Sequence, residues 1–224
     1  MKIFKVKSNM GSLGKGDSWK ASDLIIDDCG EIEVVKGNIE ETNKNIYETV
    51  KENKKCILIG GDHAITYSSF KGFIENYKDG ILVMFDAHVD CSNNFKPCTH
   101  EDFLRVILEE KLVKDENVYL VGVRKIYDVE TEFLKGRKVN FVDNVDEIKG
   151  ENIYLSLDID VINSDEAPGV IYNVEGGLTG EEVKKMLKKL KKRIKVMDLV
   201  EVVPENDVNN KTVKLAKELL EVIR

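Results

Sequence analysis

Short apolar runs alternate along this chain with longer segments whose apolar residues recur at helical spacing. The runs are continuous rather than alternating, which is typical of strands buried on both faces of a parallel sheet. They predict strands at residues 56–59, 81–85, 118–123, 153–157 and 196–203. Helical periodicity predicts helices near residues 65–77, 103–108, 183–194 and 213–223. This alternation predicts an α/β chain with a three-layer α/β/α fold and a mostly parallel central sheet.

Length and composition narrow the class of protein. The 224 residues, 42% of them hydrophobic, fit a single domain over residues 1–224 with a full core. A net charge of −7 disfavours nucleic acid as a partner, because phosphate binding needs a basic face. No apolar stretch approaches the ~20 residues of a membrane span, and the first residues do not resemble a signal peptide. We therefore expect a cytoplasmic protein that does not bind membranes.

The cysteines fit a reducing compartment. The chain has four cysteines and no CxxC pair. Cys91 and Cys98 flank a loop and could form a bridge, but free thiols are the favoured interpretation.

The three histidines of the chain lie in one short stretch, beside carboxylates. Two of them belong to compact clusters, and a third cluster of carboxylates follows later in the sequence. Each cluster lies at the end of a predicted strand or just after it, and Glu201 ends the last predicted strand. Ligands of open parallel sheets bind beyond the carboxyl ends of the strands, so we expect these groups to converge at one edge. The clusters are Gly60-Gly61-Asp62-His63, Asp86-Ala87-His88-Val89-Asp90 and Ser156-Leu157-Asp158-Ile159-Asp160.

Imidazole and carboxylate groups at these spacings predict a metal site. Two imidazoles and four carboxylates would leave too much negative charge on a single ion, so two divalent ions fit better. Oxygen-rich ligation with some nitrogen favours Mn2+, with iron, cobalt and zinc as the alternatives. For the second cluster alone, the alternative is a polar loop with capping aspartates. Asp62 is expected to orient His63 or to cap the following helix.

These three clusters, in this order, resemble motifs of the arginase/agmatinase (ureohydrolase) family. The Glu201-Val202-Val203-Pro204 segment resembles the family's late glutamate motif, so the resemblance runs from about Gly60 to Pro204. It implies the arginase-like fold and hydrolysis of a guanidino C–N bond by a metal-bridging hydroxide, with release of urea and an amine. It also implies six ligands for two Mn2+ ions per chain: His63, Asp86, His88, Asp90, Asp158 and Asp160.

The resemblance implies roles for two further residues. His100 is expected to donate a proton to the leaving amine, and Glu201 to pair with the planar guanidinium. Asp90 is expected to act in catalysis as well as in metal binding. The alternative for His100 is a histidine at a helix N-terminus, beside Thr99, and the alternative for Glu201 is a surface glutamate after a strand.

The substrate is the least defined part of the resemblance. Glu101 stands after His100, where glycine is usual, and Val161 follows Asp160 in place of the usual Asp-Pro. The short loop over residues 90–100 is similar to that of agmatinases, and His100 argues against formiminoglutamase-like members. Arginase-like recognition of an amino-acid head group is only partly offered by Ser92, Asn93 and Asn94. A small cationic guanidine such as agmatine is therefore favoured, with arginase or another guanidino or formimino-acid hydrolase as the alternative.

Two other classes of protein remain open. One is a zinc-type deacetylase of related fold, which needs a single metal, so a content near two metals per chain would exclude it. The other is a non-catalytic metal-binding paralogue that binds a guanidino ligand or a partner protein. Family resemblance also implies a homo-oligomer.

Overall fold

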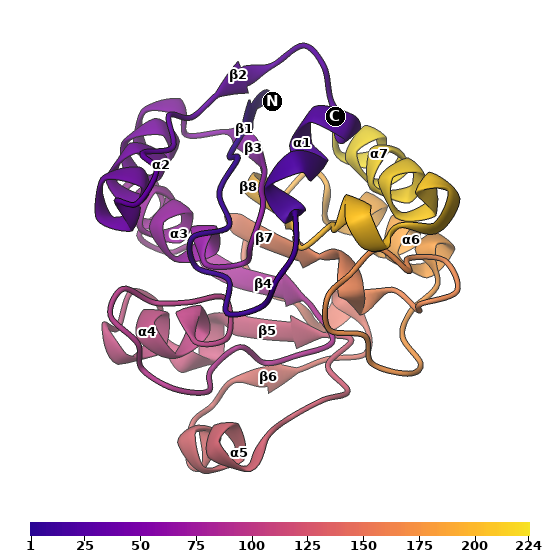
Figure 1. Ribbon diagram of the computed structural model, residues 1–224. Helices are drawn as coiled ribbons and strands as arrows, with labels where there is room; N and C mark the ends of the chain where they lie inside the picture. The colour runs from indigo at the N-terminus through magenta and orange to yellow at the C-terminus, as the bar shows by residue number, and fades with distance from the viewer.

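The computed structural model describes residues 1–224 and places all strands in one eight-stranded sheet (Figure 1). The order across the sheet is β2-β1-β3-β8-β7-β4-β5-β6, and every pairing is parallel. The prediction of a mostly parallel sheet is therefore confirmed. The strands are β1 (Lys2–Lys5), β2 (Gly30–Glu31), β3 (Cys56–Ile59), β4 (Ile81–Phe85), β5 (Val118–Val121), β6 (Asn140–Phe141), β7 (Ile153–Asp158) and β8 (Ile194–Val200).

Helices cover both faces of this sheet, which gives the predicted three layers (Figure 1). Helices α2 to α4 pack on one face, and α1, α6 and α7 pack on the other. Side chains alternate between the two cores, so along β4 Val83 faces α1, α6 and α7 while Leu82 and Met84 face the opposite side. The helices are α1 (Ala21–Ile25), α2 (Ile39–Asn53), α3 (Ile65–Asn76), α4 (Phe103–Glu109), α5 (Asp128–Leu134), α6 (Gly180–Leu190) and α7 (Lys211–Ile223).

Several elements were not expected from the apolar pattern. Strands β2 and β6 have only two residues each, too few to show a period. Helix α2 buries Thr42, Ile46 and Val50, so a polar residue interrupts its apolar stripe. Strand β8 ends at Val200 rather than at Val203, because Glu201 takes a left-handed φ of 62°.

Two further features concern the cysteines and the helices. All four cysteines are free. Among the helices, none combines the length and the apolar character that crossing a membrane would need.

Candidate metal centre

Four adjacent strands deliver the candidate site. In the sheet, β3, β8, β7 and β4 are neighbours, and their carboxyl ends carry or precede His63, Glu201, Asp158 and Asp86 respectively. Hydrogen bonds continue past the end of β3 and β8, since the Glu201 N–H donates to the Gly61 carbonyl at 2.9 Å. The convergence expected from the sequence therefore has a direct cause in strand order.

The segment before His63 is fixed by the N-terminal part of the chain. The Asp62 N–H donates to the Ser8 carbonyl at 3.1 Å. A Cβ at Gly61 would lie 1.8 Å from the Ser8 carbonyl oxygen, so only glycine fits this approach. The Asp62 carboxylate accepts from the N–H groups of Gly11 at 3.1 Å and Ala64 at 2.9 Å. Asp62 thus ties two segments together behind His63, in agreement with the supporting role expected for it.

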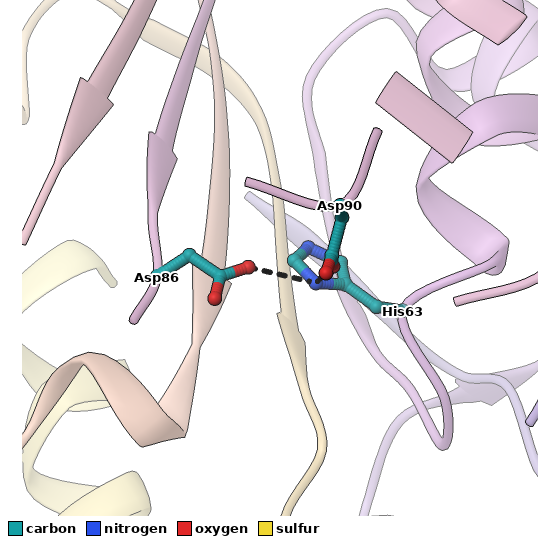
Figure 2. A group of neighbouring side chains, drawn as sticks. All are labelled: His63, Asp86 and Asp90. Carbon is teal, nitrogen blue, oxygen red and sulfur yellow. Dashed lines mark ion pairs between the residues drawn. The ribbon is translucent and has the colours of Figure 1, made fainter. Parts of the chain in front are cut away.

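Three carboxylates surround one ring nitrogen of His63. Its Nδ1 lies 3.2 Å from Asp86 Oδ2, 3.0 Å from Asp90 Oδ2 and 3.3 Å from Asp158 Oδ2. Figure 2 shows the His63 ring with Asp86 and Asp90 converging on this nitrogen. His63 Nδ1 and Asp86 Oδ2 are both buried and neither has a hydrogen-bond partner. Orphaned polar atoms of this kind call for an explanation, and a bound cation supplies one.

A second group forms around His88. Its Nδ1 lies 2.8 Å from Asp160 Oδ2 and 3.5 Å from Asp86 Oδ1. Asp86 therefore presents one oxygen to each histidine and stands between the two groups. The Ala87 N–H donates to the other oxygen of Asp160 at 2.9 Å. The Asp160 N–H in turn donates to Asp158 Oδ1 at 2.8 Å, which leaves Asp158 Oδ2 facing His63.

The electrostatics of this cluster are those of a site in which four carboxylates face only two imidazoles. Burial and the neighbouring Asp86 raise the pKa of Asp90 to about 7. Burial, Asp160 and Asp86 raise the pKa of Asp158 well above its usual value. Burial opposes ionisation of Asp86, but its contacts with the two histidines lower its pKa to about 2. Burial likewise opposes the charged form of His88, yet Asp160 and Asp86 raise its pKa to about 12.

Such a cluster holds protons until cations replace them. Its donors form two groups that share Asp86, one of which contains His63 and Asp90 and the other His88 and Asp160. Imidazole nitrogens and carboxylate oxygens suit divalent ions such as Mn2+, so the residues present fit two ions.

Two residues at the site have a strained backbone. Asp90 and Glu201 take φ angles of 53° and 62°, in the left-handed region that non-glycine residues rarely adopt. Strain of this kind persists where the surrounding structure fixes the residue, and it is concentrated at functional sites. Both side chains reach His63, since Asp90 Oδ2 lies 3.0 Å from its Nδ1 and Glu201 Oε1 accepts from its N–H.

His100 and Glu201 lie together beside the cluster. Glu201 Oε1 accepts from the His63 N–H at 2.8 Å and lies 3.2 Å from His100 Nδ1. The other ring nitrogen of His100, Nε2, accepts from the Leu13 N–H at 3.1 Å. In a neutral ring, Nδ1 therefore carries the proton and points at Glu201. Burial lowers the pKa of His100, but the hydrogen bond to Glu201 and the negative charges of Glu201, Asp90 and Asp62 together outweigh it, so the pKa is raised.

The pocket above the cluster is strongly acidic. Thirteen residues line it, and none is lysine or arginine. Tyr127 and Tyr172 form part of its wall, and the Tyr172 ring centre lies 5.7 Å from that of His100. The acidic lining residues are Asp90, Glu101, Glu130, Asp158, Asp160 and Glu201. Such a lining attracts cationic molecules and disfavours anionic ones.

All eight residues predicted as metal ligands or catalytic groups meet in this one site. The sequence interpretation missed the supporting residues: Ser156, Asp198 and the backbone of Leu13. Asp198 had a visible signal, because it is the one ionisable residue in the apolar run from Val196 to Val200. The contact from Leu13 had none, since it is a backbone bond across 87 residues.

Comparisons with known proteins point to one family. The family model described as the Arginase family matches residues 2–223. An uncharacterized 32.2 kDa protein of Methanothermus fervidus is 32% identical over 202 residues, covering 82% of this chain and 69% of that protein. An agmatinase of Blochmanniella floridana is 31% identical over 198 residues, covering 82% of this chain and 65% of that enzyme.

Solved structures agree on the fold. The crystal structure of formimidoylglutamase from Bacillus subtilis matches with a TM-score of 0.91 and 21% identity, covering 99% of this chain and 85% of that one. At this identity the likeness shows the fold alone. The chain spans about two thirds of the length of the two curated relatives from Methanothermus fervidus and Blochmanniella floridana.

Proposed function

The chain belongs to the arginase family, and we propose that it is a binuclear manganese hydrolase that cleaves a C–N bond of an agmatine-like guanidino compound. The products would be urea and an amine. The observation that carries the proposal is the pair of histidine-centred groups that share Asp86. A single-metal enzyme has no need of the His63 group, which contains the two orphaned atoms.

The ligands divide between two ions. His63, Asp90 and Asp158 would hold one ion, His88 and Asp160 would hold the other, and Asp86 would contact both. Two divalent ions supply a nucleophile near neutral pH, because they lower the pKa of water. The oxygen-rich donor set favours manganese over iron, cobalt and zinc.

The remaining groups bind and protonate the substrate. The Glu201 carboxylate lines the pocket and offers the planar acceptor pair that a guanidinium prefers. His100 holds its Nδ1 proton against Glu201, so this proton lies beside the bound guanidino group and is available to the leaving amine. Asp90, which also lines the pocket, adds negative charge that stabilises the cation.

The pocket wall favours a substrate with a cationic tail. Of the three residues that could have bound an amino-acid head group, only Ser92 lines the pocket. Asn93 is exposed, and the Asn94 amide bonds to Glu109 instead. The wall also lacks a lysine or arginine that would pair with the carboxylate of arginine or of a formimino acid. Agmatine, which carries an amine at the far end, avoids that mismatch.

A urea-release assay on the Mn2+-loaded protein tests the proposal. Agmatine and guanidinobutyrate form a matched pair, because an amine in the first takes the place of a carboxylate in the second. We expect a higher kcat/KM for agmatine than for guanidinobutyrate, guanidinopropionate or arginine. A preference for arginine would overturn the proposed substrate. The absence of urea from all four, with two ions bound, would overturn the guanidino hydrolase and leave a formimino-acid hydrolase or a non-catalytic paralogue.

The proposal extends to the state of the protein in the cell. The net charge of −7 supports a small cationic substrate rather than nucleic acid as partner. Family membership supports a homo-oligomer that acts in the cytoplasm, away from membranes, and light scattering on the purified chain tests the oligomeric part.

A further inference from the structure

Asp198 is a carboxylate in the middle of the sheet, away from the pocket. It lies on β8 and is fully buried, between the apolar residues Met197 and Leu199. An isolated buried charge is costly, so its retention requires hydrogen-bond donors. Three hydroxyl groups provide them: Ser156 Oγ at 2.7 Å, Thr66 Oγ1 at 2.8 Å and the Tyr154 hydroxyl. Burial raises the pKa of Asp198, and these donors oppose the rise because they stabilise the carboxylate.

One of the three hydroxyls connects Asp198 to the metal centre. Ser156 Oγ lies 2.7 Å from Asp198 Oδ1 and 2.7 Å from His63 Nε2. Ser156 and Asp198 face one another in the register of β7 and β8, so the parallel pairing itself holds them together. The result is a buried chain from Asp198 through Ser156 to the back of the His63 ring.

The protons available along this series of hydrogen bonds determine which nitrogen of the His63 ring is protonated. A hydroxyl has one proton, and a carboxylate can only accept, so Ser156 donates its proton to Asp198. Ser156 Oγ must then accept from His63, which places a proton on Nε2. When a cation binds, the ring therefore keeps the Nε2 proton and presents the lone pair of Nδ1. Nδ1 is the orphaned atom that faces the three carboxylates.

We propose that Asp198, acting through Ser156, is a positioning residue that selects the metal-binding tautomer of His63. This inference rests on the metal centre of the proposed function and adds a residue outside the ligand set. Groups that hold the far nitrogen of a ligating histidine typically raise metal affinity by about 10–100-fold.

Asp198 should raise the affinity for only one of the two ions. His88 has no hydrogen bond from its Nε2 to any group of the protein, and its ring is partly exposed. No buried chain of this kind supports it. Loss of Asp198 should therefore weaken the ion held by His63 and spare the ion held by His88.

Titration of the metal-free protein with Mn2+, followed by the signal of free Mn2+, tests this inference directly. We expect Asp198→Asn to lower the affinity of one site by about 10–100-fold and to leave the other unchanged. An asparagine amide can donate to Ser156, which then donates to His63 Nε2 and stabilises the wrong tautomer. Ser156→Ala breaks the same chain by another route and should give the same selective loss, even if Asp198→Asn does not fold.

Thr66→Val is the matched control. It removes a donor from the same carboxylate, and with it a 3.3 Å contact to Ser156 Oγ, while the bonds from Ser156 to Asp198 and to His63 remain. It should cost stability, measured by thermal unfolding, but keep both Mn2+ affinities. Parent-like affinity at both sites in Asp198→Asn and Ser156→Ala would overturn the inference, as would an equal loss in Thr66→Val. A parent protein that binds fewer than two ions would instead overturn the proposed metal centre, and this inference with it.

Discussion

Replacing Glu201 by glutamine separates substrate binding from metal binding. The side chain is buried, and its Oε1 accepts from the backbone N–H of the ligand His63 at 2.8 Å. A glutamine amide keeps a carbonyl oxygen for that bond, and for the contact with His100 Nδ1. It removes the negative charge and replaces the second carboxylate oxygen by an NH2 group, which donates hydrogen bonds instead of accepting them. We therefore expect Glu201→Gln to retain both ions and to lose most of its turnover.

The magnitude follows from the two hydrogen bonds that a guanidinium makes with a carboxylate. A bond to a charged group contributes about 1.5–3 kcal/mol, against about 0.5–1.5 kcal/mol for a neutral pair. In Glu201→Gln, the bond from the guanidinium to the amide oxygen is weakened to the value of a neutral pair. The second bond is lost, because the amide NH2 group and the guanidinium are both donors. The loss should reach about 3–4 kcal/mol, which is about 10²–10³-fold in kcat/KM.

Urea release measured over a range of agmatine concentrations gives kcat and KM, and elemental analysis gives the metal content. Because Glu201 holds the cation in the ground state as well as in the transition state, KM should rise while kcat falls. Glu201→Ala serves as the contrast. It orphans the His63 N–H, so it should also weaken metal retention. A kcat/KM within about 3-fold of the parent, or loss of an ion from Glu201→Gln, would refute the assignment.

The remaining predictions concern the ions, the proton donor and the pocket rim. His88→Ala and Asp158→Ala each remove a ligand and should lose metal, so two ions per chain in either variant would contradict the ligand set. Chelation should remove about 2.7 kcal/mol of stability for each of the two Mn2+ ions present at 100 times its dissociation constant. The loss of each ion lowers the Tm by about 5–11 °C, and an unchanged Tm after confirmed metal loss would contradict a preformed site. His100→Ala should keep both ions, lower kcat by about 10²–10⁴-fold and be partly rescued by imidazole; turnover at the parent rate would exclude its role. Glu101→Gln should raise KM for agmatine about 2–5-fold but not KM for guanidinobutyrate, and an unchanged ratio between the two would show that Glu101 does not contact the tail.

The apolar pattern predicted the centre of the sheet better than its edges. Strands β3 and β4 begin and end at the predicted residues, because a run buried on both faces is unbroken and ends sharply. Strand β1 was missed because it carries lysines and is only partly buried. Helix α2 was missed because Thr42 replaces an apolar residue in its buried stripe, where its hydroxyl accepts from the Val35 N–H.

The candidate ligands could be predicted because each lies at or just after the end of a strand, where parallel topology gathers side chains from distant parts of the sequence. What holds them could not be predicted in the same way. The bond between Ser156 and Asp198 depends on the register of β7 against β8, and a shift of one residue would turn the two side chains to opposite faces. Both residues can be read from the sequence, but the strand register that places them side by side cannot.

The N-terminal segment shows the same limit at His100, the proposed proton donor. The family motifs begin near Gly60, so nothing in them connects residues 8–13 with the site. Yet the His100 N–H donates to the Gly11 carbonyl at 3.0 Å, and His100 Nε2 accepts from the Leu13 N–H. Backbone groups make both contacts, so they depend on the path of the chain and not on which side chains it carries. The tautomer that aims the His100 proton at Glu201 is therefore fixed by backbone groups of Gly11 and Leu13, and not by a side chain of that segment.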